Sequence, residues 1–266
     1  MSSWDNVTQG DPEMPKLLVV FVGHMRSFHK VADSLRDNLI APAQADCALF
    51  TRTSRGYARH DGDHQYQNAS HLVSMFENRF HPKISRSFPM RKLPDEYIKS
   101  KPHACSWAFA RDGGQHLSNV SHFRSSIQGV LGMFELFKLA ADSVRGFAKD
   151  YDLIMRCRPD VMLKSAFPLG ELERSMENPK MIVGPDYCNL EHAGGINDQI
   201  FCGRPEAILE LMSIYDRLPQ YIEEGHVLHP EPILGHHMRC LGLSKTNIPI
   251  HYKLKRDQEK IRKPRL

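Results

Sequence analysis

The sequence lacks the long apolar runs and the leader pattern that would place it in or across a membrane. A membrane-spanning helix needs roughly 18 apolar residues, whereas the longest early apolar run covers residues 17–22. Residues 1–15 are polar and acidic, without the charged-then-apolar pattern of a secretion signal. We therefore expect a flexible N-terminus and a cytoplasmic protein.

Cysteine pairs at metal-binding or redox spacing are also missing. The six cysteines are widely scattered and no CxxC pair occurs, so the sequence predicts neither a zinc site nor a disulfide framework. Cys47, Cys157 and Cys202 lie inside apolar, strand-like runs. A free cysteine in such a run behaves as a small hydrophobic residue, which is consistent with a reducing compartment.

Two common nucleotide-binding fingerprints are absent. Neither the P-loop G-x-x-x-x-G-K-[ST] nor the three-glycine dinucleotide pattern occurs. The first apolar run instead ends in Gly23-His24-Met25-Arg26-Ser27. Gly23 would let the backbone approach a ligand, Arg26 could pair with a phosphate, and the following helix would offer N–H groups to an anion. We interpret this turn, with His24, as a nucleotide contact; a plain strand-to-helix turn is the alternative.

The composition is that of a globular protein with a substantial core. The chain has 266 residues, of which 41% are hydrophobic and 25% charged, with a net charge of +4. We expect one domain over residues 16–256. Residues 253–265 carry seven basic and two acidic side chains. We interpret residues 257–266 as a solvated basic tail, with peripheral membrane contact as the alternative, and we expect no nucleic-acid partner.

Apolar periodicity alternates between strand and helix. Strands are expected at 16–22, 46–51, 151–158, 181–183, 199–202 and 248–254, and helices at 28–39, 72–80, 123–144, 205–218 and 234–241. Residues 83–115 contain several prolines and a Gly-Gly pair, so we expect an irregular, mobile active-site loop with one strand. This alternation predicts an α/β fold with a mostly parallel sheet covered by helices on both faces. Ligands bind such sheets beyond the carboxyl ends of the strands.

The motif with the most chemical content is at residues 151–160, where an apolar strand ends in Arg156-Cys157-Arg158-Pro159-Asp160. Side chains alternate along a strand, so Arg156 and Arg158 are expected to share a face. A diphosphate between them would receive bidentate contacts. Asp160 could hold a divalent cation, Mn²⁺ or Mg²⁺, that bridges the same diphosphate. A structural Arg–Asp cluster at the sheet edge is the alternative.

These motifs carry a resemblance. The turn at 23–28, the long helix before residues 151–163 and the later stretch 197–208 resemble GT-A-like glycosyltransferases, many of them predicted polysaccharide-building enzymes of bacteria and large viruses. The resemblance extends from about Lys16 to Arg256. It implies that a D-x-D motif ends a central strand and binds a metal with the donor's diphosphate. Here that place reads Arg158-Pro159-Asp160, which keeps only the second acid, so Arg158 could itself supply the positive charge.

A literal D-x-D occurs elsewhere, at Asp61-Gly62-Asp63, with His60 and His64 on either side. No strong strand precedes it and its surroundings are polar. We interpret it as a solvated loop rather than a metal site.

Asp198 and Glu231 are the candidates for a general base that deprotonates an acceptor hydroxyl. Asp198 follows a Gly-Gly turn and precedes the apolar Ile200, and the resemblance implies that this region faces the acceptor. Glu231 lies in a proline-flanked helix start, where an acid is also favoured by the helix dipole. A base needs a carboxylate within hydrogen-bond reach. His236 and His237 are interpreted as one surface and one core histidine rather than ligands.

The sequence thus predicts a glycosyltransferase that moves a sugar from a nucleoside diphosphate donor to a hydroxyl of a glycan or similar acceptor. Two alternatives stay open. One is a non-catalytic module that binds nucleotide or carbohydrate. The other is a sulfotransferase, whose phosphosulfate-binding loop residues 19–28 loosely resemble, although Phe28-His29-Lys30 replaces the expected hydroxyl run.

Overall fold

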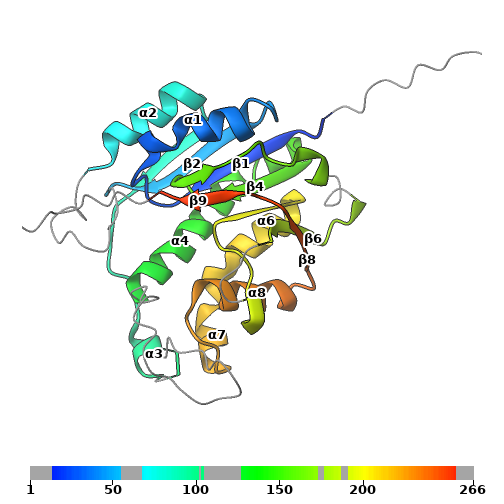
Figure 1. The fold of residues 1–266 in the computed structure, drawn as a ribbon. Helices are drawn as coiled ribbons and strands as arrows, with labels where there is room; N and C mark the ends of the chain where they lie inside the picture. The colour runs from blue at the N-terminus through cyan, green and yellow to red at the C-terminus, as the bar shows by residue number, and fades with distance from the viewer. Residues whose placement is uncertain are drawn as a thin grey trace, which may run out of the picture.

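A seven-stranded sheet forms the centre of the molecule, in the strand order β3-β2-β1-β4-β7-β6-β8 (Figure 1). The computed structural model describes residues 14–54, 68–101, 103–104, 127–172, 177–186 and 191–255. The strands of this sheet are β1 (Leu17–Val22), β2 (Asp46–Arg52), β3 (Ile84–Phe88), β4 (Leu153–Cys157), β6 (Met181–Pro185), β7 (Ile200–Gly203) and β8 (Ser244–Ile248). The expected mostly parallel α/β sheet is confirmed.

The central strands of the sheet are parallel and buried. β1 is buried along its whole length and pairs in parallel with β2 on one side and β4 on the other. A strand covered on both faces reads as a continuous apolar run, as β1 does. β7 pairs antiparallel with β4 and with β6. The start of β7 therefore lies at the same edge of the sheet as the ends of β1 and β4.

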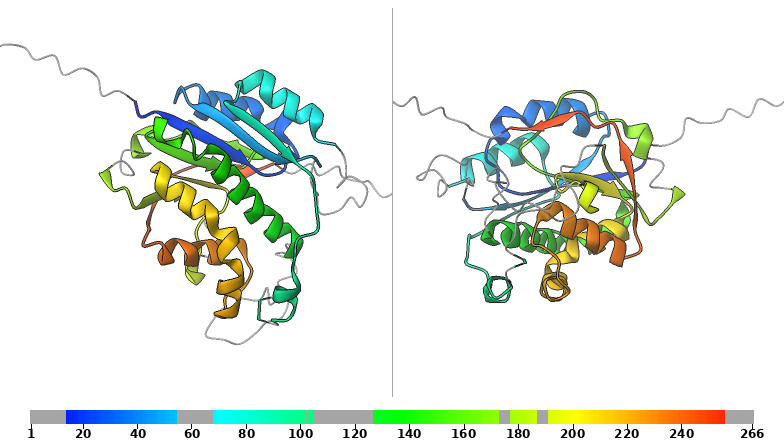
Figure 2. Two further views of the ribbon diagram at one scale, coloured as in Figure 1. Left: turned by 180° about the vertical axis from the view of Figure 1, so that it is seen from behind. Right: turned by 60° about the horizontal axis from the view of Figure 1, so that its bottom comes forward.

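Helices cover both faces of the sheet, as Figures 1 and 2 show. One face carries α1 (Ala32–Leu35) and α2 (Ser70–Phe80), and the other carries α4 (Ile127–Val144), α6 (Pro205–Met212), α7 (Leu218–Glu223) and α8 (Pro230–Cys240). Each face has its own apolar cluster. Leu18 and Val20 of β1 enter the α4 side, whereas Val19 and Phe21 enter the α1 side, as the alternation of side chains along a strand requires. The short helix α3 (Glu96–Lys99) contacts α7.

A buried ion pair holds α4 against the sheet. Arg52, the last residue of β2, donates to the carboxylate of Glu135 at 2.6 Å and to the carbonyl of Gly132 at 2.8 Å. Both charged side chains are buried, whereas Arg91, which binds the other oxygen of Glu135, is exposed. Because a buried charge needs a partner, this pair fixes the register of α4 over β2.

Three expected elements differ from the structure. The helix expected at 205–218 is α6 followed by a 3₁₀ turn (Ser213–Arg217) and the start of α7. The helix expected at 28–39 is broken into a 3₁₀ turn (Phe28–Lys30), α1 and a π-helical turn (Arg36–Ile40), because Val31 has a non-helical φ of −121°. The strand expected at 248–254 is two strands, β8 and β9 (Tyr252–Leu254), since Pro249 has no N–H to continue a strand pairing. β9 pairs with β5 (Val161–Leu163), which the sequence did not predict, in a second, two-stranded sheet.

Several expectations fall on residues that the structure does not describe. Residues 1–13, the Asp61–Asp63 motif and the basic tail at 257–266 lie outside the described residues. The same holds for residues 105–115 of the expected irregular segment, of which residues 83–101 contain β3 and α3. Among the described helices, none is long and apolar enough to cross a membrane. The described cysteines Cys47, Cys157 and Cys202 are buried, as expected.

Close backbone packing under α8 generates a stability prediction. A Cβ atom at Gly235 would lie 2.0 Å from the carbonyl oxygen of Gly194, so alanine there forces the two backbones apart. Such overpacking typically costs about 1–3 kcal/mol. We expect Gly235→Ala to lower the free energy of unfolding by at least this amount in urea denaturation.

Gly132→Ala in α4 is the matched control. Its Cβ would meet only an Arg52 nitrogen at 3.6 Å, an ordinary contact. Alanine improves helix propensity by about 0.8–1 kcal/mol over glycine, so this variant should be neutral or more stable. Equal losses in the two variants would contradict the packing of α8 on Gly194.

Candidate functional site

The ends of β1 and β4 form a topological switch point of the sheet. The two strands are adjacent and parallel. The chain leaves β1 through α1 on one face of the sheet, but reaches β4 from α4 on the opposite face. Where connections diverge in this way, a crevice opens beyond the strand ends, and ligands of open α/β sheets bind there. The candidate residues at 23–27 and 158–160 follow β1 and β4 directly, and Asp198 precedes β7 at the same edge.

Arg158 and Asp160 form a bidentate ion pair beside this switch point. Nε and NH2 of Arg158 each donate to one carboxylate oxygen of Asp160 at 2.8 Å. Arg26 approaches the same carboxylate, with NH1 at 3.6 Å from Oδ2. The exposed fractions are 23% for the Arg26 side chain, 16% for Arg158 and 1% for Asp160. The two arginine side chains are therefore partly exposed, while the carboxylate between them is enclosed.

Arg156 belongs to the protein interior. Only 1% of it is exposed, and its guanidinium donates to the carbonyls of Asp198 and Val22, the latter at 3.2 Å. Its Cζ lies 4.5 Å from the ring centre of Phe137. Burial lowers the pKa of Arg156 to about 10, which leaves it charged at neutral pH. The predicted contact of Arg156 with a diphosphate is not supported, because no surface of its guanidinium is open to a ligand.

Asp160 does not fit the metal-ligand role predicted for it. Both carboxylate oxygens accept from Arg158, and Arg26 adds a second positive charge beside them. A divalent cation at that carboxylate would have to displace one guanidinium and sit next to the other, and like charges at this range repel strongly. Arg26 and Arg158 supply positive charge at this edge without a metal ion.

The turn after β1 is held in a strained shape. Gly23 has a φ of +144°, and a Cβ there would lie 3.2 Å from Cδ of Pro159, so only glycine fits easily. Arg26 also has a positive φ, 24°, which is uncommon for a residue with a side chain. Strained backbone of this kind persists where the surroundings determine it, often at ligand sites.

The N–H groups that follow this turn are used internally. The N–H of Phe28 donates to the carbonyl of Met25, and that of Lys30 donates to Ser27. The segment is a three-residue 3₁₀ turn rather than a helix start. The expected anion-binding helix N-terminus is therefore not supported, and any anion here would depend on side chains, chiefly Arg26 and Arg158.

His24 lies near Arg26, Arg52 and Arg158 and is neutral at neutral pH. Its Nδ1 is 3.3 Å from the carbonyl oxygen of Ser54. Burial, with Arg26 next in size, lowers its pKa to about 4, and Arg52 and Arg158 act in the same direction. At neutral pH His24 can offer a polar edge to a ligand without adding a further positive charge.

Asp198 and Glu231, the two candidate bases, are both buried and both border the same edge. The charge of Asp198 acts on Arg158 and on His229, the residue before α8, where it opposes the lowering of the His229 pKa by burial. The carbonyl of Glu231 accepts from the N–H of Ile196, two residues before Asp198. The structure thus brings together two acidic residues that are 33 positions apart in the sequence.

Tyr252 of β9 completes this group and was missed by sequence reasoning. Its hydroxyl accepts a hydrogen bond from the Asn197 side chain at 2.7 Å. Burial raises its pKa above the ordinary range, and the nearby charges of Asp198 and Glu231 add to this effect. No local motif marks Tyr252, because its role depends on the pairing of β9 with β5.

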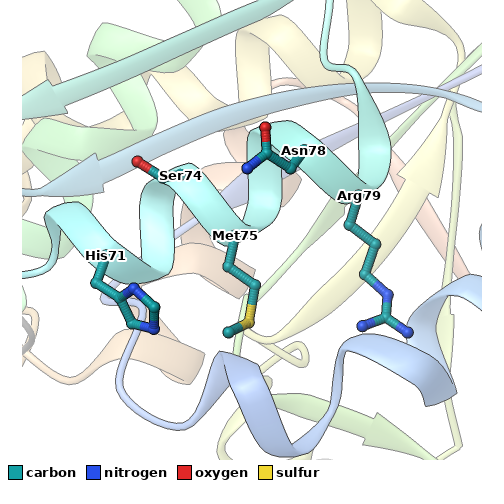
Figure 3. Close-up of a pocket in the computed structure, with 5 residues that line it drawn as sticks. All are labelled: His71, Ser74, Met75, Asn78 and Arg79. Atoms are coloured by element: carbon teal, nitrogen blue, oxygen red, sulfur yellow. The ribbon is translucent and has the colours of Figure 1, made fainter.

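A separate surface depression lies elsewhere on the molecule. It measures about 430 Å³ and is lined by side chains of α2, as Figure 3 shows: His71, Ser74, Met75, Asn78 and Arg79. Residues of a single helix line it, and Arg79 forms an ion pair with Asp33 of α1. This depression is on the α1–α2 face and shares no residue with the edge described above.

Comparison with known proteins gives no information on the function of this site. No protein family and no curated protein matches the chain.

The low pKa of His24 predicts a pH-dependent stability. Between pH 4 and 6.5 the unfolded chain binds a proton at this histidine that the folded protein does not. Stability should therefore fall as the pH is lowered through this window, by up to a few kcal/mol, at about 1.4 kcal/mol for each unit of pKa difference. Urea denaturation at a series of pH values measures this loss.

His24→Asn should flatten part of that profile. His237, whose pKa burial also lowers to about 4, should account for a remaining part. A profile unchanged by His24→Asn would show that His24 titrates freely in the folded protein.

Proposed function

We propose that this chain is a GT-A-like glycosyltransferase that transfers a sugar from a nucleoside diphosphate donor to a hydroxyl of a glycan or similar acceptor. The observation that carries the proposal is the convergence of two partly exposed arginine side chains, Arg26 and Arg158, with two buried acidic residues, Asp198 and Glu231, at the switch point of the sheet. These are the groups that such a transfer needs: positive charge for the leaving diphosphate and a base for the acceptor.

The position of the Arg158-Pro159-Asp160 motif supports the resemblance. It follows β4, which lies between β1 and β7 near the middle of the sheet. The resemblance implies a charged motif at the end of a central strand, and the structure has one there. Pro159 packs against Gly23, so the motif and the turn after β1 form one surface.

The diphosphate would be bound by arginine side chains. Arg26 and Arg158 lie on either side of the Asp160 carboxylate and keep part of their surface open. Asp160 would orient both guanidinium groups, a role that its burial and its paired oxygens suit. Charge-assisted contacts of this kind stabilise a leaving group whose negative charge grows in the transition state.

Asp198 is the proposed general base. Its backbone is fixed by Arg156, and its carboxylate lies near His229, Arg158 and Tyr252. It would accept the proton of the acceptor hydroxyl as the oxygen attacks the sugar carbon and the bond to the diphosphate breaks. Glu231, which borders the same group, is the second candidate.

A non-catalytic module that binds nucleotide or carbohydrate remains the second candidate function. The observation that favours it is the enclosure of Asp160 by arginine, which leaves the motif without a carboxylate for a metal. Release of the free sugar or its transfer, assayed with a panel of nucleotide sugars, separates the two functions.

Arg26→Ala tests the donor site without leaving the buried Asp160 carboxylate unpaired, because Asp160 still forms its ion pair with Arg158. Loss of a charge-assisted contact is worth about 1.5–3 kcal/mol, so the affinity for a nucleoside diphosphate sugar should fall by roughly ten- to a hundredfold in calorimetry. Arg36→Ala, an exposed arginine paired with Asp37 on the α1 side, is the control and should bind as the wild type does. If phosphoadenosine phosphate binds tightly while nucleoside diphosphates do not, the sulfotransferase alternative is favoured.

Asp198→Asn tests the chemistry separately from binding. It keeps the shape and the donor affinity but removes the proton acceptor, so kcat should fall by about 10²–10⁴-fold while the Kd for the donor stays near the wild-type value. Glu231→Gln is the matched variant and should lose much less. Normal turnover in Asp198→Asn together with an inactive Glu231→Gln would exchange the two roles.

A further inference from the structure

A second cluster of ligand-type side chains lies away from the proposed active site, between the end of α7 and α8. Donor atoms of Glu224, His226 and His236 all lie within 4.8 Å of one another. Cys240 adds a sulfur from the next turn of α8, with Sγ 3.4 Å from Nε2 of His236. His236 and Cys240 are four residues apart, so they share one face of the helix.

Two separations measured from Nε2 of His236 suit a small tetrahedral ion. Zinc binds nitrogen, oxygen and sulfur at about 2.0–2.3 Å, which places neighbouring tetrahedral ligands about 3.3–3.8 Å apart. Nε2 of His236 lies 3.7 Å from Oε2 of Glu224 and 3.4 Å from Sγ of Cys240. Both distances fall in this range.

We propose that Glu224, His226, His236 and Cys240 form a zinc-binding site. Two imidazoles, a thiolate and a carboxylate form a ligand set that favours zinc over Mg²⁺ or Ca²⁺, because those two ions prefer oxygen ligands. The imidazole rings of His226 and His236 stack with their centres 3.6 Å apart. Binding releases the thiol proton of Cys240 to solvent.

Neighbouring groups prepare these ligands. Gln220 donates to Oε1 of Glu224 at 2.8 Å, which leaves Oε2 for the ion, and such outer contacts orient metal ligands. His237 takes no part, because its two nitrogens contact the hydroxyl of Tyr221 and the carbonyl of Glu210. His237 is therefore the expected core histidine, whereas His236 lies in the cluster.

An ion here would clamp the segment that joins α7 to α8. Residues 224–229 connect the two helices, and α8 carries Glu231 in its first turn. The site would stabilise the position of α8 whatever reaction the protein performs. The proposal thus stands independently of the proposed glycosyl transfer.

Titration of the metal-free full chain with Zn²⁺ tests the proposal. We expect one strongly bound equivalent and a raised Tm, since a ligand that binds only the folded state stabilises it. Removing even an outer contact of a metal site costs about 10–100-fold in affinity, so His226→Ala and Glu224→Gln should each weaken binding at least tenfold. His71→Ala, an exposed histidine of α2, is the control and should bind zinc as the wild type does.

A second control addresses the His60 and His64 pair. Tight binding that survives His226→Ala and Glu224→Gln but is lost in a His60→Ala/His64→Ala double variant would overturn the proposal. Absence of tight binding in the wild type would overturn it as well. Circular dichroism of each variant confirms that the chain is folded before its affinity is compared.

Substitution with Co²⁺ tests the fourth ligand. A tetrahedral site with a thiolate should give intense visible bands and a sulfur-to-cobalt charge-transfer band, and Cys240→Ser should remove the latter. A cobalt complex with the weak spectrum of an octahedral ion would contradict the tetrahedral ligand set.

Discussion

The buried guanidinium of Arg156 is the constraint on which the arrangement of the site depends. It lies between the sheet and α4, where it donates to the last carbonyl of β1 and to the carbonyl of Asp198, with the rings of Phe137 and Phe201 nearby. A charge so enclosed needs hydrogen-bond acceptors; NH1 and NH2 of Arg156 have them in these two carbonyls, whereas its Nε has none among the described residues. The strand end that carries Gly23 and Arg26 is thereby tied to the strand start that carries Asp198. Binding groups and the proposed base keep a fixed separation because one internal cation holds both.

Local sequence pattern was sufficient for the elements whose burial is uniform. β1 is a continuous apolar run, β2 and β4 each contain a short apolar run, and α4 repeats apolar residues at helical spacing, so each was predicted close to its observed bounds. The sequence pattern did not predict that Arg156 faces the core. The alternation of side chains along β4 assigns each side chain to one face of the sheet, but it does not indicate which helix covers that face. The sequence left open whether Arg158 and Asp160 bind a ligand or form a structural cluster with each other, because the choice depends on side-chain geometry that spacing does not contain.

The features that the sequence concealed are those made by distant segments. β5 and β9 are three residues each and pair across the chain from residue 161 to residue 254. Neither has a strong period of its own, so Tyr252 reaches Asn197 through a contact that no local rule describes. The zinc ligands are concealed for a related reason. Cysteine spacing gave no hint of a metal, because Cys240 joins histidines and a carboxylate instead of another cysteine.

The last described residues close the edge on which the first strand ends. The carbonyl of Lys255 accepts from the hydroxyl of Ser27, and its N–H donates to the carbonyl of Asp160 at 2.9 Å. During synthesis, then, β1 and β4 can pair long before this strap exists, and the turn after β1 must wait for residue 255 to emerge. Because Lys255 binds both Ser27 after β1 and Asp160 after β4, these two contacts are the last of the proposed site to become possible in chain order.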